Sequence, residues 1–141
     1  MYGLVGAGYD VLLPYGENVR YDLVIDDGVQ LARVQCKTGR LRKGAVVFHT
    51  ASTYGHHPNP NVIKRHYLGE VDYFGVFCPE TGGIYLVPIE ETPNRSSANL
   101  RIDPPRNNQL RRVRFAANYE IERLRPTEEP GARAGDSGSC A

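Results

Sequence analysis

The stretch Arg20–Lys37, RYDLVIDDGVQLARVQCK, predicts two β-strands joined by a tight turn, and the rest of the fold is built outward from it. Asp27-Gly28 stands between two apolar alternations, which is a strong signal for a β-hairpin. Because successive side chains of a strand point to opposite faces, and a two-residue loop pairs even with odd positions, the hairpin is predicted to have one apolar and one polar face. The apolar face is expected to carry Tyr21, Leu23, Ile25, Ala32, Val34 and Cys36.

The polar face of this hairpin is predicted to hold Asp22, Gln35 and Lys37 together. The Cβ atoms of Asp22 and Gln35 are expected about 5 Å apart if the residues are directly opposite, and roughly 7–8 Å apart if they are diagonal. Oxygen ligands of this kind suit Mg²⁺, which takes one or two carboxylates and keeps waters and phosphate oxygens. An ammonium group two residues along could orient an attacking water or neutralise charge on a phosphate. The pattern indicates a metal-dependent phosphodiesterase.

Asp22 followed by Gln35-Cys36-Lys37 resembles the signature of the PD-(D/E)XK nuclease superfamily, with Gln in the position usually held by Asp or Glu. With Gln at that position, the motif resembles that of the group I intron-associated, homing-type endonucleases of the superfamily. The resemblance covers roughly residues 9–120. It runs through GENVRYDLVID (16–26), RVQCKTGR (33–40), VDYF (71–74) and YLVP (85–88), and weakly through NNQ (107–109).

The resemblance implies an α/β, restriction-endonuclease-like core, a mixed β-sheet with flanking helices. It also implies an N-terminal helix with a further acidic ligand, but residues 1–8 are short and rich in glycine, so this helix is predicted to be short or missing, and no acid precedes Asp10 to supply the ligand. The implied cofactor is Mg²⁺, with Mn²⁺ as the alternative. Asp22 would be a metal ligand, Gln35 would face the metal or position water, and Lys37 would be the catalytic lysine. The backbone carbonyl of Cys36 would complete the coordination while its thiol packs into the core.

Glu17 lies close to Asp22 in the sequence and is a candidate for an additional metal ligand. As an exposed residue of the turn at 14–18 it needs no such role, and this is the favoured interpretation. Because Gln35 is neutral, the predicted site holds less negative charge than is usual in the superfamily, which should either weaken metal binding or require a second acid such as Glu17.

The implied function is hydrolysis of phosphodiester bonds in double-stranded DNA by a homing-type endonuclease. Cutting both strands with one site per subunit favours a homodimer or homotetramer. A Holliday-junction resolvase is a related alternative. A DNA-binding protein that has lost catalysis is a different one, favoured by Gln35 and the missing N-terminal acid, whereas Asp22 and Lys37 favour the nuclease.

Charge is unevenly distributed although the net charge is only +1. Residues 31–43 carry five bases and no acid, residues 95–114 carry six arginines and one acid, and residues 70–91 carry five acids and no base. A basic ridge near Lys37 suits phosphate contacts, although a charge run can equally be a solvated face. The candidate DNA-binding residues are Arg33, Arg40, Arg42, Lys43, and, from a polar loop at 49–61, Ser52 and Tyr54.

The length of 141 residues predicts one nuclease-like domain over 1–125 and a disordered tail over 126–141. Further strands are predicted over 45–49, 71–78 and 84–89, and helices over 62–68 and 107–124. Three scattered cysteines without metal spacing favour a reducing cytoplasm. No apolar run approaches the length of a membrane span, so no membrane partner is expected.

Overall fold

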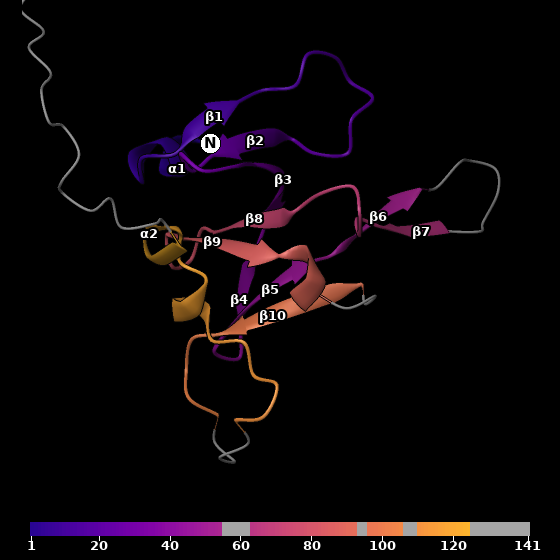
Figure 1. Cartoon of the computed structure of the whole chain (residues 1–141). Helices are drawn as coiled ribbons and strands as arrows, with labels where there is room; N and C mark the ends of the chain where they lie inside the picture. The colour runs from indigo at the N-terminus through magenta and orange to yellow at the C-terminus, as the bar shows by residue number, and fades with distance from the viewer. Residues whose placement is uncertain (55–62, 93–95, 106–109, 125–141) are drawn as a thin grey trace, which may run out of the picture.

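The computed structural model describes residues 1–54, 63–92, 96–105 and 110–124. The tail predicted over 126–141 lies outside these residues. Figure 1 shows the elements in chain order. They are α1 (Tyr2–Gly6), β1 (Asp10–Leu12), β2 (Leu23–Asp26), β3 (Leu31–Thr38), β4 (Arg40–Arg42), β5 (Ala45–His49), β6 (Ala51–Tyr54), β7 (Ile63–His66), β8 (Tyr73–Cys78), β9 (Gly83–Pro88), η1 (Ile89–Glu91), β10 (Ser97–Arg101), η2 (Ala116–Asn118) and α2 (Ile121–Leu124).

The central sheet has five strands in the order β1-β2-β3-β8-β9. The β3–β8 pair is parallel and the other three pairs are antiparallel. The prediction of a mixed sheet with flanking helices is therefore confirmed. The parallel pairing places β3, which carries Gln35 and Lys37, in the middle of the sheet beside the apolar strand β8.

The connection between β2 and β3 is four residues long, because Asp26 pairs with Leu31. The Asp27 carboxylate holds this loop by accepting hydrogen bonds from the backbone N–H groups of Val29 and Gln30, both at 2.8 Å. These bonds, the one from Gln30 first, lower the pKa of Asp27. Gly28 supplies the positive φ of 87° that the loop needs. A four-residue loop keeps the even-to-odd pairing expected for a two-residue loop, so Leu23, Ile25, Ala32 and Val34 share one buried face as predicted. Tyr21 departs from the prediction, because it packs against the cluster on the opposite face.

Two hydrophobic clusters cover the two faces of the central sheet. One contains side chains of β8 and β9 together with Phe48 of β5 and Leu100 of β10. Phe48 packs edge-on against Phe74 at a ring distance of 5.8 Å. Figure 1 shows the three-stranded sheet β10-β5-β4 lying beneath β8 and β9. The other cluster joins Leu23, Ile25 and Val34 to residues of α1 and α2.

Two predicted helices are wrong. Residues 63–66 form strand β7, which pairs with β6 to make a two-stranded ribbon projecting from the core (Figure 1). In the described part of 107–124, which begins at Leu110, the helical segments are η2 and the four-residue α2. Leu110, predicted to lie in a core stripe, is 64% exposed. The chain instead makes single bridges to strands, Phe115 with Arg101 and Glu120 with Tyr85.

The helix at the N-terminus is short, as predicted. Helix α1 has five residues and no acid in its first turn, and it buries only Leu4. Among the described residues, no helix is long and apolar enough to cross a membrane.

Candidate active site

Asp22 and Gln35 meet on the polar face of the β2–β3 hairpin. Continuing the pairing of Leu23 with Val34 by one residue places Asp22 directly opposite Gln35. Gln35 Nε2 and the backbone N–H of Cys36 both donate to Asp22 Oδ2, each at 2.6 Å. The Asp22 side chain is exposed, so this carboxylate is open to solvent at the end of β2.

Lys37 lies two residues beyond Gln35 on β3 and is half-buried. Its Nζ donates to Tyr67 Oη at 3.2 Å. The same nitrogen lies 4.7 Å from the ring centre of Tyr67 and 5.9 Å from that of Phe74. The ammonium is thus held at the edge of the aromatic cluster that covers this face of the sheet.

The prediction that the Cys36 thiol packs into the core is wrong, because the residue is exposed. Its neighbour on β8 is Gly75, which has no side chain to cover the sulfur. The sulfur still lies close enough to protein atoms that partial desolvation raises the pKa of the thiol, and the charge of Asp22 adds to this.

Glu17 is exposed in the turn that precedes β2. Among the described residues, no three His, Cys, Asp or Glu side chains lie close enough together to hold a metal ion. Of the side chains predicted as ligands, Asp22 and Gln35 are joined by a hydrogen bond.

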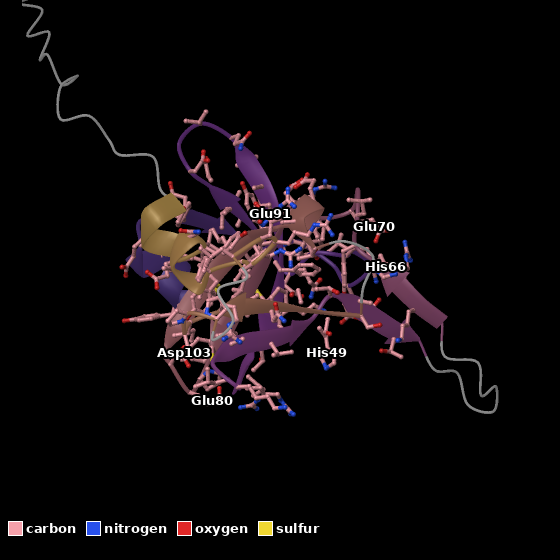
Figure 2. The ribbon with its side chains drawn as sticks, turned by 90° about the horizontal axis from the view of Figure 1, so that it is seen from below. His49, His66, Glu70, Glu80, Glu91 and Asp103 are labelled. Carbon is pink, nitrogen blue, oxygen red and sulfur yellow. The ribbon has the colours of Figure 1, made fainter. Side chains whose placement is uncertain are left out.

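Arg20 is the centre of a network that the sequence analysis did not single out. Its Nε donates to Glu70 at 2.6 Å and its Nη1 to Ser52 Oγ at 2.9 Å, while Nη2 reaches the carbonyl of His66 at 3.3 Å. Arg65 also binds Glu70. The hydrogen bond from Arg20, followed by the one from Arg65, lowers the pKa of Glu70. Figure 2 shows Glu70 and His66 together near the base of the β6–β7 ribbon.

Two of the predicted DNA-binding residues bind other side chains of the same chain. The Arg33 guanidinium binds both carboxylate oxygens of Asp72 at 3.1 Å. The hydrogen bond from Arg33 is the main cause of the lowered pKa of Asp72. Ser52 is half-buried in β6, not in a loop, and its hydroxyl holds Arg20. Tyr54 ends β6, and its side chain lies outside the described residues.

The other predicted DNA-binding residues follow β3 directly. Arg40 and Arg42 are exposed at the two ends of β4, and Lys43 is exposed in the turn after it. Arg40 makes a 3.6 Å ion pair with Glu80 that is open to solvent, which is a weak interaction.

A basic cavity of about 870 Å³ lies beside this turn, with Lys43, Arg101, Arg111 and Arg112 among its lining residues. Asp103 is the one acid in that lining. Figure 2 shows Asp103 on the opposite side of the molecule from Glu70. Lys43 and Arg112 are the two non-glycine residues with positive φ in the described part of the chain, a conformation that is uncommon outside functional sites and turns. The arginine run at 95–114 pointed to this surface, but only the fold brings it next to Lys43.

An Asp opposite Gln-X-Lys on neighbouring strands of a mixed sheet is the arrangement that the sequence resemblance implies for a PD-(D/E)XK nuclease. A sequence model of the PD-(D/E)XK endonuclease family matches residues 1–122, and the chain belongs to this family. Nucleases of this family generally use divalent metal ions. Among solved structures, the bacterial homing endonuclease I-Ssp6803I is similar, with a TM-score of 0.65 and 24% sequence identity over 84% of this chain and 79% of that chain. At that identity the likeness shows the fold. A comparison with curated proteins gives no match.

Proposed function

We propose that this chain is a divalent-metal-dependent, homing-type endonuclease that hydrolyses phosphodiester bonds of double-stranded DNA. The observation that carries the proposal is an exposed carboxylate, Asp22, directly opposite Gln35 and on the same face of the hairpin as Lys37. Membership of the PD-(D/E)XK endonuclease family supports the nuclease reaction. The homing type is supported by the resemblance around Gln35 and by a fold shared with a bacterial homing endonuclease.

The donor set fits a hard divalent cation such as Mg²⁺ or Mn²⁺. Asp22 would supply a carboxylate oxygen, Cys36 its backbone carbonyl, and Gln35 an amide oxygen after its terminal amide turns over. Glu17 is the further proposed ligand. When bound, the ion supplies positive charge that polarises the scissile phosphate and makes a nearby water more acidic. In the present arrangement the Gln35 amide donates to Asp22, so it neutralises part of the charge that the ion would otherwise meet.

Lys37 would act on the phosphate and the attacking water. Its ammonium can donate to a phosphate oxygen and offset the negative charge that develops there in the transition state. Exposed Arg42 and Lys43, with Arg40, would contact the phosphates that flank the cleaved bond. Arg33 and Ser52 are not expected to contact DNA, because their polar groups bind Asp72 and Arg20.

The direct test is nicking of a supercoiled plasmid with Mg²⁺, with Mn²⁺ and with EDTA. Cleavage with either ion and none with EDTA is expected. DNA binding without cleavage under every condition would instead identify a binding protein that has lost catalysis, the alternative favoured by the Gln35–Asp22 hydrogen bond. Preference for four-way junctions over linear duplex would identify a resolvase.

We also propose that the protein works as a homodimer or homotetramer in the cytoplasm. One site per chain cuts one strand, so a double-strand break requires two copies acting together. Light scattering during size-exclusion chromatography measures the number of subunits directly. A monomer that makes only nicks would contradict the proposal of double-strand cleavage.

Replacing Gln35 by glutamate should strengthen metal binding. Two facing carboxylates attract a divalent ion more strongly, because affinity rises with ligand charge, and the metal concentration for half-maximal cleavage should fall by roughly tenfold. Without metal the two like charges lie directly opposite and should lower the free energy of unfolding by about 0.2–1 kcal/mol. Metal titration of the cleavage rate and thermal melting with and without Mg²⁺ measure both effects. Gln30→Glu adds the same charge in the hairpin loop and should not change the metal titration.

Removing two charges from the basic cavity should weaken DNA binding equally for all sequences. Phosphate contacts carry no base information, and each lost contact should make the slope of log K against log salt shallower by about 0.9. Arg111→Gln with Arg112→Gln tests this, because glutamine keeps a side chain at the strained position. Arg125→Gln with Arg133→Gln removes the same two charges outside the family match and is the control for net charge. An unchanged salt slope would exclude this cavity from the DNA interface.

A further inference from the structure

Lys37 has a specific partner in Tyr67. The ammonium donates to the Tyr67 hydroxyl at 3.2 Å and lies 4.7 Å from the centre of its ring. A hydrogen bond fixes the distance of the nitrogen, and the attraction between a cation and the negative face of an aromatic ring restricts its direction. Together they restrict a side chain that otherwise has four rotatable bonds and high rotamer entropy.

Tyr67 is itself rigidly held. It is 5% exposed, and its ring meets Phe74 edge-on at 5.5 Å with an interplanar angle of 86°. Its carbonyl accepts hydrogen bonds from the N–H groups of Glu70 at 3.0 Å and Val71 at 3.2 Å. Because Tyr67 is fixed both by packing and by a turn, its hydroxyl can hold the Lys37 ammonium in one place.

The same ring contacts a second cation. The Arg20 guanidinium carbon lies 4.1 Å from the ring centre, while its nitrogens bind Glu70, Ser52 and the carbonyl of His66. Arg20 precedes Asp22 by two residues. Tyr67 therefore joins the segment that carries the carboxylate to the strand that carries the lysine, although it lies 30 residues beyond Lys37 in the sequence.

A purely structural role would explain the burial of Tyr67 and its contact with Phe74. It does not account for a hydroxyl directed at Lys37 and a ring shared by two cations. Phenylalanine would fill the core as well. Two cations near one ring repel each other, so other favourable contacts must offset the cost of placing both there.

We propose that Tyr67 is a positioning residue for Lys37, and that Arg20 fixes Tyr67 and the start of β2 in the same arrangement. The inference rests on the proposed function of Lys37 as the residue that acts on the scissile phosphate. Tyr67 would not touch the DNA. It would set the direction of the Lys37 ammonium before the substrate binds, so its loss should lower kcat and leave KM unchanged.

Single-turnover cleavage of a DNA duplex tests the proposal in a double-mutant cycle. Tyr67→Phe should lower the cleavage rate by about tenfold, the effect of losing one net hydrogen bond. In a Lys37→Met background, Tyr67→Phe should cause no further loss, because the group it positions is already gone. Rate losses that multiply would overturn the proposal. Tyr85→Phe, which removes a hydroxyl from a buried tyrosine of the same cluster, is the matched control and should cleave at the wild-type rate.

Nuclear magnetic resonance tests the contact without relying on activity. The ε-methylene protons of Lys37 should be shifted upfield by the aromatic ring in the wild type and in Tyr67→Phe, and should move toward their ordinary position in Tyr67→Leu. No movement in Tyr67→Leu would overturn the proposal even if the enzyme is active. A protein that cuts no DNA but shows the shift would contradict the proposed function and leave the contact established.

Discussion

Replacing Lys37 by methionine is expected to lower the rate of DNA cleavage by roughly 10²–10³-fold, the usual cost of removing one donor to a developing negative charge. Methionine is long, flexible and apolar, so it should pack against Tyr67 and Phe74 and leave the fold intact. DNA binding should weaken only by the loss of one positive charge. The decisive measurement is the single-turnover rate with saturating enzyme, since it separates cleavage from binding.

Lys64→Met is the matched control for this substitution. Lys64 lies on β7, where its Nζ binds Ser96 Oγ at 2.7 Å. Its replacement removes the same charge and should leave the cleavage rate close to that of the wild type. Equal cleavage by the wild type and Lys37→Met would reject the catalytic role assigned to Lys37.

Asp22→Asn is expected to abolish metal-dependent cleavage. Asparagine can still accept a hydrogen bond from the backbone N–H of Cys36, so the end of β2 should remain in place. The substitution removes the one carboxylate of the Asp22–Gln35 pair. The cleavage rate should therefore fall by at least about 10²-fold at any accessible metal concentration. Binding of the duplex in EDTA should persist, because a negative charge facing the phosphates has been removed. Filter binding and plasmid nicking on the same preparation measure the two effects.

Asp10→Asn controls for the loss of an acid from the same sheet. Asp10 is exposed on the edge strand β1, opposite Asp26 and away from the Asp22–Gln35 pair. This variant should cleave DNA at the wild-type rate. Substantial cleavage by Asp22→Asn in Mg²⁺ would mean that other groups, Glu17 first among them, bind the ion.

The parts of the site that could be predicted from sequence depend on local rules. The alternation in β2 and β3 fixes which side chains share a face, and it places Asp22 and Gln35 on the same one. That the two are directly opposite and not diagonal follows from the four-residue loop that the structure shows. The exposure of Cys36 could not be predicted in this way. Whether the apolar side of β3 is covered at that point depends on its partner in β8, which is Gly75, almost 40 residues away.

The helix predictions failed because distant pairing overrode the local pattern. Ile63–His66 is too short to be stable alone in either form, and its backbone hydrogen bonds go to β6, where Ser52 lies opposite Arg65. The stripe of apolar residues that begins at Leu110 fits a helix, but the chain there is held by bridges to Arg101 and Tyr85. Helix propensity is a weak prior that such contacts routinely override.

A role for Arg20 near the site could have been suspected from its position. It stands two residues before Asp22, within the stretch GENVRYDLVID that carries the resemblance, and alternation predicts the same face for both. Its partner could not be identified, because Ser52, His66 and Glu70 lie 32 to 50 residues further along the chain.

The register of β2 and β3, more than the length of the loop between them, limits how this nuclease can change over evolutionary time. Loop tips ordinarily tolerate length variation, and a longer or shorter loop leaves Asp22 opposite Gln35 as long as Asp26 still pairs with Leu31. A slip of one residue in the pairing would instead put Asp22 and Gln35 on opposite faces of the sheet. Homologous chains should therefore vary in the length of this loop and keep the register of the two strands.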